Sequence, residues 1–396
     1  MHQMSMGSRI EYLIQIKKRY LKAKTKTEKS FLLNEIVGIT GMNRRYLIGL
    51  LQAKFDLAYK RIRQRKKRKP TYDSQVLHYL KKIWDILDCP CGQRLAPMLS
   101  EMIKVLERCK EILFPSDVKE KLKTISSSTI DRLLRPFKAS KRRKLHGTTK
   151  PGSLLKKHIP IVLSRYNVAE LGHSEIDLVA HNGGNPEGEF ANTLTDTDLS
   201  SGWTEEDAFL GKAQKRVIAA IENINNRRPF KRKSIDSDTG GEFINWMLWK
   251  WCDVKKILFT RGRPGKKNDN PHVEQKNWTH VRKLVGYHRY DTEQQVDLLN
   301  DLYRNEWRLY ENFFQPTIKL VEKKRVGGHV KKVYEQARTP YQRILESKEV
   351  DEKTKAGLKK LYESLNPAAL KRTIERKLDV LFKTINHYQG QQVKKP

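Results

Sequence analysis

Three acidic residues are spaced along the sequence so that they could together form one metal-dependent site. Asp177 lies in EIDLV, Asp238 in SIDSDTGGEF and Glu274 in NDNPHVEQKN, and 35 residues separate the last two. Magnesium is a hard cation that prefers oxygen ligands. Two such ions about 4 Å apart can activate an attacking oxygen and stabilise a leaving oxygen at one phosphorus. One carboxylate between the ions and one on each side would supply that arrangement.

Each acid by itself also has an ordinary structural explanation. Asp177 could be a surface strand residue, and Asp238 could belong to a turn before Gly240 and Gly241. Glu274 could be a carboxylate that the dipole of a helix N-terminus favours. The three acids in this order are far more specific than any one of them. A carboxylate in the middle of a strand is costly to bury without a partner, which favours a functional role for Asp177.

Neighbouring acids are expected to do other work. Asp236 precedes Asp238 by two residues and is interpreted as a strand residue or a supporting residue of the site. Asp196 and Asp198 in LTDTDLSSGW end a predicted strand, and turn chemistry is the expected role for both.

A mixed α/β fold must position the three acids. HSEIDLVAH alternates as a strand, EFANTLTDTDLSSGWTEEDAFL reads as two strands joined by a turn, and KAQKRVIAAIENINNR is an amphipathic helix. A strand in RKSIDSD, a helix in FINWMLWKWC, a strand in KKILFT and a helix in HVEQKNWTHVRKLVG follow. Three successive strands and then alternating elements predict a mixed sheet with helices on its faces.

The acidic segments resemble a known catalytic core. EIDLV, IDSDTGGEFIN and NPHVEQKN, with the 35-residue spacing, are similar to the DD35E core of integrases and transposases, especially bacterial insertion-sequence transposases. The resemblance implies a ribonuclease H-like catalytic core over residues 166–290. Asp177, Asp238 and Glu274 would be its catalytic, metal-binding triad, holding two Mg²⁺ or Mn²⁺ ions. One departure is Thr239, where many relatives have asparagine.

The same resemblance implies a DNA transposase. Such an enzyme binds the terminal repeats of its element, cleaves the ends with metal-activated water, and joins the 3′-OH ends to target DNA by transesterification. Its partners would be double-stranded DNA, as terminal inverted repeats and as target, and further copies of the chain in a homodimer or higher multimer. The expected location is the bacterial cytoplasm, in association with the nucleoid. The alternatives are a non-catalytic DNA-binding repressor or domesticated transposase, and a metal-dependent nuclease on the same fold.

Composition supports a polyanionic partner. The 396 residues include 80 Lys and Arg against 45 Asp and Glu, a formal net charge of +35. Such an excess attracts nucleic acid, although ribosomal and membrane-surface proteins can be equally basic. No run approaches roughly 18 apolar residues, so no membrane-spanning helix is expected. The four cysteines fit no zinc-ligand or disulfide pattern and are interpreted as reduced thiols.

The N-terminal region, 1–60, is predicted to be a helix-turn-helix DNA-binding domain. KSFLLNEIVGITGMNRRYLIGLLQ reads as two short helices with a break near Gly41. Asn43, Arg44 and Arg45, followed by Tyr46, would open the recognition helix and contact DNA. A plain helical hairpin is the alternative.

Two basic linkers flank a second helical region. Residues 61–73 form the first linker, 74–137 a second helical DNA-binding domain that contains STIDRLL, and 138–165 the second linker. Charged runs are often solvated, but DNA affinity grows with each neutralised phosphate. The candidate DNA contacts in the linkers are Arg63, Arg65, Lys66, Lys67, Arg142 and Arg143.

The loop RGRPGKKNDNP and the helix after it offer further candidate DNA contacts. In chain order they are Arg261, Arg263, Lys266, Lys267, Lys276 and Arg282. The C-terminal region, 291–396, begins with a long helix over 292–314, whose aromatic residues are expected in a core or an oligomer interface. IKLVEKKRVGGHVKKVYEQ predicts a basic β-hairpin on DNA, and LNPAALKRTIERKLDVLF a terminal helix. The predicted fold class is therefore a multidomain α+β protein.

Overall fold

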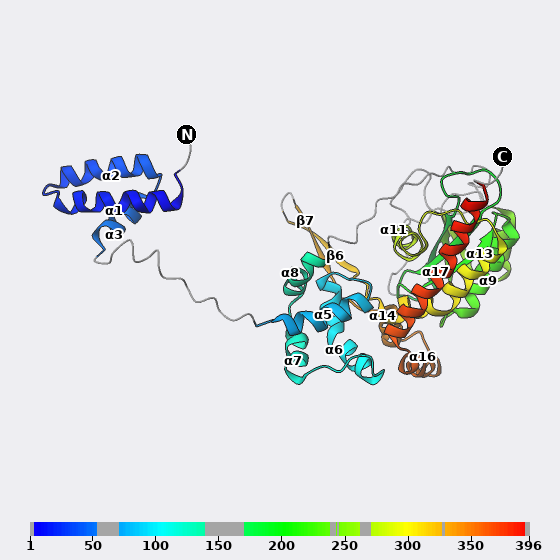
Figure 1. Ribbon diagram of the computed structural model, residues 1–396. Coiled ribbons are helices and arrows are strands. Elements are labelled where there is room, and N and C mark those ends of the chain that lie inside the picture. Colours follow the sequence, from blue (N-terminus) through cyan, green and yellow to red (C-terminus); the bar gives the residue numbers. More distant parts are fainter. Residues whose placement is uncertain are drawn as a thin grey trace. The chain divides into compact units, whose positions relative to one another are not determined.

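The computed structural model describes residues 4–53, 71–138, 170–237, 243, 245–261, 271–326 and 329–392. Within these ranges, the side chains of 271, 272, 274, 323, 326 and 386–392 lie outside the description. The chain divides into two compact units, Met1–Thr71 and Tyr72–Pro396 (Figure 1).

Unit 1 is a small helical body. It consists of α1 (Met6–Lys22), α2 (Lys26–Thr40) and α3 (Arg44–Gln52). A capping box between Thr25 and Glu28 starts α2, and Gly41 ends it with a left-handed φ of 65°. Apolar residues at helical spacing on all three helices form one core: Leu13, Ile16, Tyr20, Leu32, Leu33, Ile36, Leu47, Leu50 and Leu51.

Unit 2 begins with four helices, α5 (Ser74–Ile86), α6 (Gly92–Arg108), α7 (Ser116–Thr124) and α8 (Ser127–Lys138). Their apolar faces enclose Trp84, Leu99 and other buried side chains. The same core continues into Phe313 and Tyr341 from the C-terminal part of the chain. The tyrosine hydroxyl of Tyr310 also donates a 2.6 Å hydrogen bond to the carbonyl of Ile86. These four helices therefore pack as part of unit 2.

A five-stranded mixed sheet forms the centre of unit 2. Its strands are β1 (His173–Ala180), β2 (Ala191–Asp198), β3 (Thr204–Leu210), β4 (Ser234–Ser237) and β5 (Leu258–Arg261). They lie in the order β3-β2-β1-β4-β5, with β1, β2 and β3 antiparallel and β4 and β5 parallel to β1. The predicted mixed sheet and the predicted order of strands and helices are confirmed.

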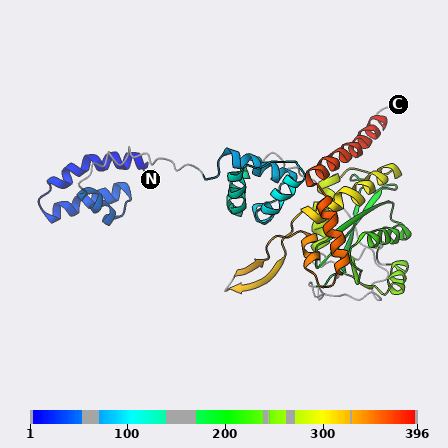
Figure 2. The ribbon, with the colours of Figure 1, turned by 90° about the horizontal axis from the view of Figure 1, so that it is seen from below.

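Helices cover both faces of this sheet (Figure 2). On one face, α9 (Gln214–Arg227) and α10 (Trp246–Val254) pack on Ile176, Leu194 and Ile235. On the other face lies an almost continuous helical segment, made of α11 (Pro271–Lys276), the π-helical η2 (Asn277–Arg282) and α12 (Lys283–Val285). Side chains alternate along a strand, so residues beside Ile176 and Ile235 point to this second face.

The predicted helix over 292–314 is present as α13 (Glu293–Leu302), the π-helical η3 (Tyr303–Trp307) and α14 (Arg308–Phe314). Its aromatic residues, including Tyr303, Tyr310 and Phe313, are buried. They are core residues and not a base-stacking platform.

The chain then forms the predicted hairpin, β6 (Leu320–Val326) and β7 (His329–Tyr334), as a separate two-stranded sheet. Three helices follow, α15 (Pro340–Glu346), α16 (Glu352–Ser364) and α17 (Pro367–Gln392). The terminal helix was predicted, whereas α15 and α16 were not.

The four cysteines are free thiols. Within the described part of the chain, no helix is both long and apolar enough to span a bilayer.

Candidate active site

Strand β1 presents two carboxylates to the face that α11 and η2 cover. Glu175 and Asp177 are two residues apart and therefore share this face, while Ile176 between them is buried on the other face. Glu175 is only 4% exposed, whereas Asp177 is half-buried. Asp177 lies opposite Thr195 of β2 in the antiparallel register.

Strand β4 adds a third carboxylate to the same face. Asp236 is the register partner of Glu175, is 6% exposed, and accepts a 2.9 Å hydrogen bond from the hydroxyl of Thr260. The register ends where Ser237 pairs with Ile176, the residue before Asp177. Asp238 follows Ser237 in the chain and lies outside the described residues.

Two hydrogen bonds attach the covering helix to β1. The backbone amide of Val273 donates to Oε2 of Glu175 over 3.0 Å, and Nδ2 of Asn277 donates to Oδ2 of Asp177 over 2.6 Å. The backbone of Glu274 lies in α11 between these two attachment points, and its side chain is outside the description. The helix that carries the third predicted acid is therefore bound to the strand that carries the first.

Asn277 leaves one polar atom without a partner. Its Oδ1 is buried, and no described residue makes a hydrogen bond to it. A buried unsatisfied polar group costs about 1–3 kcal/mol. An amide oxygen beside a carboxylate is a donor set that suits Mg²⁺ or Mn²⁺. The described residues contain no group of three His, Cys, Asp or Glu that could hold a metal ion. Asp177 and the amide oxygen of Asn277 offer oxygen atoms of the kind that such an ion prefers.

A buried polar network holds the next part of the helix. Nδ1 of His280 lies 3.1 Å from Oε1 of Glu206 on β3, and Nε2 lies 3.1 Å from Oε2 of Glu311 on α14. Lys276 donates a 2.9 Å hydrogen bond to Nε2 of the same imidazole. The network links α11, η2, β3 and α14, and its member Glu206 lies on the same face of the sheet as Asp177.

Burial shifts the ionisation of every member of this network. It raises the pKa of Glu206 well above its usual range and the pKa of Glu311 to about 7. It lowers the pKa of Lys276 to about 8 and holds the pKa of His280 well below its usual range. Desolvation favours the neutral form of each group, and this is the shared cause.

Two predicted DNA contacts in this helix are engaged within the protein. Lys276 belongs to the buried network. Arg282 donates a 2.8 Å hydrogen bond to the carbonyl of Ala180 and lies over the ring of Tyr287. Arg261 ends β5 and is 5% exposed. These positions do not present free cations at the surface. Arg263, Lys266 and Lys267 lie outside the described residues.

Residues at the start of α3 either make contacts within unit 1 or are exposed. Oδ1 of Asn43 caps the helix by accepting from the amide of Arg45 at 2.9 Å. Arg44 is tied to α2, where it donates to Asn34 and, over 2.7 Å, to Ser30. Arg45 and the following tyrosine are exposed. The predicted linker contacts lie outside the described residues: Arg63, Arg65, Lys66, Lys67, Arg142 and Arg143.

The two acids at the end of β2 differ from each other. Asp198 serves the turn, because its carboxylate accepts from the amides of Ser201 at 2.7 Å and Gly172 at 2.8 Å. Asp196 is buried within the β2–β3 pairing, opposite Glu205, and is paired with Arg228 and Arg232. The expectation of turn chemistry was wrong for Asp196, because this residue lies inside the β2–β3 pairing, before the turn, and its carboxylate pairs with the two arginines.

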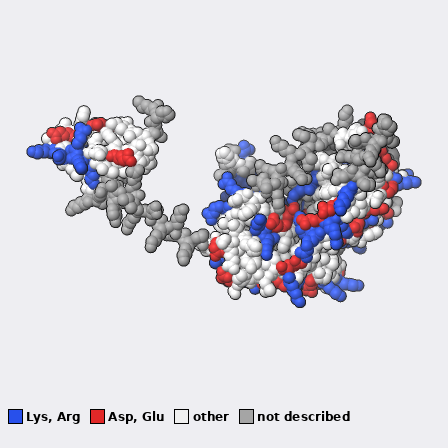
Figure 3. All heavy atoms as spheres, viewed as in Figure 1, with Lys and Arg blue, Asp and Glu red and all other residues white. Residues whose placement is uncertain are grey.

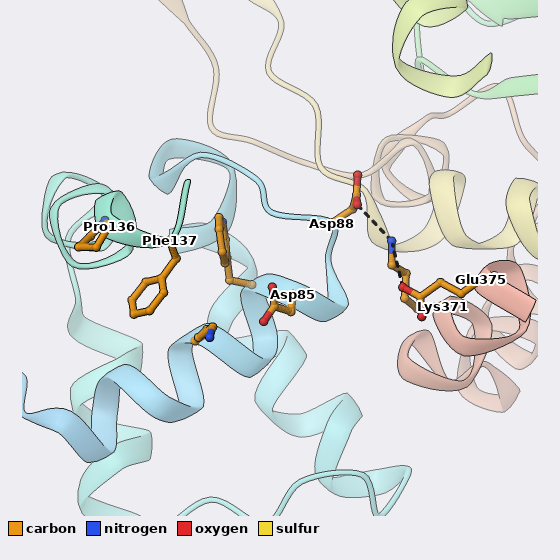
Figure 4. Close-up of a pocket in the computed structure, with 8 residues that line it drawn as sticks. Asp85, Asp88, Pro136, Phe137, Lys371 and Glu375 are labelled. Carbon is orange, nitrogen blue, oxygen red and sulfur yellow. Dashed lines mark hydrogen bonds and ion pairs between the residues drawn. The ribbon is translucent and has the colours of Figure 1, made fainter. Parts of the chain in front are cut away.

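A cavity of about 650 Å³ lies elsewhere, where α5 and α8 meet α17 (Figure 4). Lys371 bridges its rim by pairing with Asp88 at 3.1 Å and Glu375 at 3.9 Å. Its other lining residues are Lys81, Trp84, Asp85, Pro136 and Phe137. None of the predicted catalytic acids lines this cavity, so it is a junction between helices and not the candidate site.

The fold and the site together define a basic α/β protein with a carboxylate-bearing, helix-covered face on a mixed sheet. A protein of Sinorhizobium fredii (strain NBRC 101917 / NGR234), "Uncharacterized protein y4rM", is 33% identical over 333 residues, which cover 84% of this chain and 93% of that protein. The chain therefore belongs to the family of y4rM. No family model matches the chain.

Solved structures of integrases are also similar to the chain. The catalytic core domain of BIV integrase gives a TM-score of 0.29 at 18% identity, covering 44% of this chain and 94% of that one. The HTLV-2 integrase catalytic core domain in complex with magnesium gives 0.27 at 15% identity, covering 37% and 88%. The simian T-cell lymphotropic virus intasome, in complex with PP2A regulatory subunit B56 gamma, gives 0.31 at 12% identity, covering 55% and 70%.

Proposed function

We propose that the protein is a DNA transposase of the integrase type, with a ribonuclease H-like core. It binds the terminal repeats of its element, hydrolyses a phosphodiester at each end to release a 3′-OH, and joins that 3′-OH to target DNA. In the joining step the 3′ oxygen attacks a target phosphorus and displaces another 3′ oxygen. The number of phosphodiester bonds is conserved, so this step needs no external energy source.

One observation carries the proposal: the helix that contains Glu274 is fastened to β1 beside Asp177. Val273 and Asn277 make the two fastening hydrogen bonds, and β4 ends next to the same part of β1. Asp238 is the next residue in the chain after β4. The three acids of the motif thus belong to chain segments that converge on one region of the sheet.

The residues have separate roles in this proposal. Asp177, Asp238 and Glu274 would hold two Mg²⁺ or Mn²⁺ ions. Such ions supply Lewis acidity at a phosphoryl oxygen and lower the pKa of a water molecule. Asn277 orients the carboxylate of Asp177 through its 2.6 Å hydrogen bond. Glu175 keeps the covering helix in place by accepting from its backbone.

Recognition of the element ends is assigned to the helical regions. In unit 1, Arg45 and Tyr46 are exposed at the start of α3, and Tyr46 is 53% exposed. In unit 2, α8 carries exposed Ser128, Arg132 and Arg135, which lie near one another at helical spacing. Two ends must be held together for joining, so the active form is a dimer or a higher multimer on DNA.

The test is a joining reaction with the full chain. Labelled duplexes carrying the DNA that flanks the gene are incubated with a supercoiled target plasmid and Mg²⁺ or Mn²⁺. Asp177→Asn, Asp238→Asn and Glu274→Gln are compared with wild type. Asp379→Asn, at an exposed site on α17, makes the same change of charge as a control.

Each triad variant should lose joined product on the order of a thousandfold or more, the scale seen when one residue of a catalytic unit is removed. Binding of the end duplex should stay unchanged, and Asp379→Asn should join as wild type does. End binding without cutting or joining by wild type would instead support a non-catalytic DNA-binding repressor. Cutting without joining would support a nuclease.

A further inference from the structure

The hairpin β6–β7 has no core of its own. All its described side chains are exposed, and Figure 2 shows it extending away from the sheet and helices of unit 2. An isolated two-stranded hairpin is at best marginally stable in water. Its exposed apolar side chains include Val321 at 67%, Val330 at 58% and Tyr334 at 54%. We therefore expect a binding partner to cover these exposed apolar side chains.

The charge of the hairpin opposes its own formation. Residues 320–334, LVEKKRVGGHVKKVY, contain five Lys or Arg and one Glu. Lys324 stands directly opposite Lys331 in the register, and position 323, also lysine, is opposite Lys332. Like charges directly opposite each other destabilise a strand pair. Elsewhere, on the face shown in Figure 3, basic and acidic residues are interspersed. An anionic partner would remove the repulsion within the hairpin.

Both faces of the hairpin are basic. Lys324 and Lys331 share one face, whereas Arg325 and Lys332 share the other, because side chains alternate along each strand. A flat anionic surface would contact only one of these faces. A groove with phosphates on both walls would contact both. The major groove of B-form DNA admits a two-stranded β-ribbon, and its floor offers thymine methyl groups to apolar side chains such as Val330.

The base of the hairpin is fixed to the central sheet. Nζ of Lys319 donates to the carbonyl of Leu199 over 2.7 Å and to that of the next residue, in the turn between β2 and β3. Arg343 donates to the carbonyl of Thr317 over 2.8 Å and to Glu335 over 2.6 Å, at the two ends of the hairpin. The base of the hairpin is therefore attached beside the sheet that carries Asp177. An arm whose base is already positioned loses less entropy on binding.

We propose that strands β6 and β7 form an arm that lies in the major groove of duplex DNA and contacts phosphates on both walls. The proposal rests on the proposed function for the identity of the partner, but not on the cutting or joining chemistry. Pairing of a hairpin edge with a second copy of the chain is the competing use of this surface. Lysine on edge strands opposes such pairing, and two copies would bring their charges together.

The test compares two triple variants of the full chain that remove the same charge. Lys324→Ala/Lys331→Ala/Lys332→Ala changes the arm, and Lys353→Ala/Lys359→Ala/Lys360→Ala changes exposed lysines on α16. Binding to a duplex of about 30 base pairs is measured by fluorescence anisotropy without divalent ions, over a range of KCl. The arm variant should bind at least tenfold more weakly. Its log–log salt slope should fall by about 2 to 3, near 0.9 per lost phosphate contact. The α16 variant should change by less than about threefold, since its lysines make no groove contacts.

The same measurement is made on a second duplex of the same sequence that contains glucosylated 5-hydroxymethylcytosine. Its glucosyl groups block its major groove. Wild type should bind it at least fivefold more weakly than the plain duplex, and the arm variant should not distinguish the two. Equal binding by both triple variants would overturn the proposal, as would a wild type that ignores the glucosyl groups. Loss of self-association instead of DNA affinity in the arm variant would also overturn it.

These results are independent of the joining test. If the arm variant binds DNA weakly but wild type never joins DNA, the proposed arm stands and the proposed chemistry is wrong. If wild type joins DNA and the two triple variants bind equally, the chemistry stands and the arm is wrong.

Discussion

At the scale of single residues, Asn277 is the side chain that links the covering helix to the first acid of the motif. We expect Asn277→Ala to lower joining about 10- to 100-fold, the usual effect of removing a residue that orients a metal ligand. It should also raise the Mg²⁺ concentration needed for half-maximal joining. Asn305→Ala removes an exposed asparagine from the neighbouring helical segment and serves as the control.

A readout without activity checks the same point. The melting temperature of wild type should rise with added MgCl₂, because an ion bound to the folded state stabilises it. Asn277→Ala should show a smaller rise than Asn305→Ala at the same concentrations. An identical response of the two variants would contradict a role for Asn277 beside the metal.

Glu311 gives a pH-dependent prediction. Burial raises its pKa from 4.5 to about 7, and the nearby ammonium of Lys276 opposes part of this rise. Its stabilising contribution is complete below about pH 4.5 and is lost as the pH rises through the folded value, because the unfolded state releases its proton first. Glu311→Gln stays neutral. Its melting temperature, relative to wild type, should therefore rise by a few degrees from about pH 5 to about pH 8.

Lys276 affects only the size of this trend. Without the carboxylate of Glu311 beside it, the pKa of Lys276 falls further, and this also stabilises Glu311→Gln relative to wild type as the pH rises. The exposed Glu363→Gln is the control and should show no such trend. A constant difference between wild type and Glu311→Gln across this range would mean that Glu311 titrates normally.

The candidate site was predictable from sequence only in part. The acids stand out because their spacing is that of a known motif, and Asp177 occupies the strand position expected for it. Asn277 was missed, although it lies three residues after Glu274, a spacing that puts two residues on one helical face. Lys276 was expected at the DNA surface. A lysine looks exposed by residue type alone, and only the three-dimensional contacts with His280 and Glu311 reveal its buried network.

At the scale of elements, α3 begins with two arginines in different environments: Arg44 is hydrogen-bonded to α2, and Arg45 is exposed. Arg45→Ala should weaken binding to the end duplex several-fold without changing the melting temperature, because its side chain is exposed. Arg44→Ala should instead destabilise unit 1 by about 1 kcal/mol, since it loses hydrogen bonds to Ser30 and Asn34. Anisotropy on the end duplex and thermal melts by circular dichroism measure the two effects. Equal DNA affinity for wild type and Arg45→Ala would remove α3 from the recognition surface.

Elements with a clear period were predictable, and elements without one were not. Strand β1 alternates, α9 has a helical stripe, and Gly327 with Gly328 marks the hairpin. Helix α16 was missed because it contributes no fully buried residue, so its sequence shows lysines without a strong apolar stripe. The shared core of α5–α8 and α14–α15 was also invisible, because sequence periodicity shows that a face is apolar but not which distant element covers it.

At the scale of the whole molecule, the chain consists of two units that each have a core. The core of unit 1 contains only residues from α1, α2 and α3. All seven tryptophans lie after residue 71, so none belongs to unit 1. Tryptophan fluorescence therefore reports only on unit 2, whereas circular dichroism reports on the helices of both.

This difference allows a test of whether the two units unfold independently. Leu47 has no exposed surface in unit 1, so Leu47→Ala should cost about 2–5 kcal/mol, the usual range for a buried leucine. A unit of this size has little stability to spare. The variant should lose part of its helical signal at a lower temperature than wild type, while its fluorescence transition stays in place. Leu99→Ala, at an equally buried position of unit 2, should move the fluorescence transition instead. If Leu47→Ala shifts both signals together, the units unfold as one cooperative structure, and recognition by unit 1 could not be separated from the chemistry assigned to unit 2.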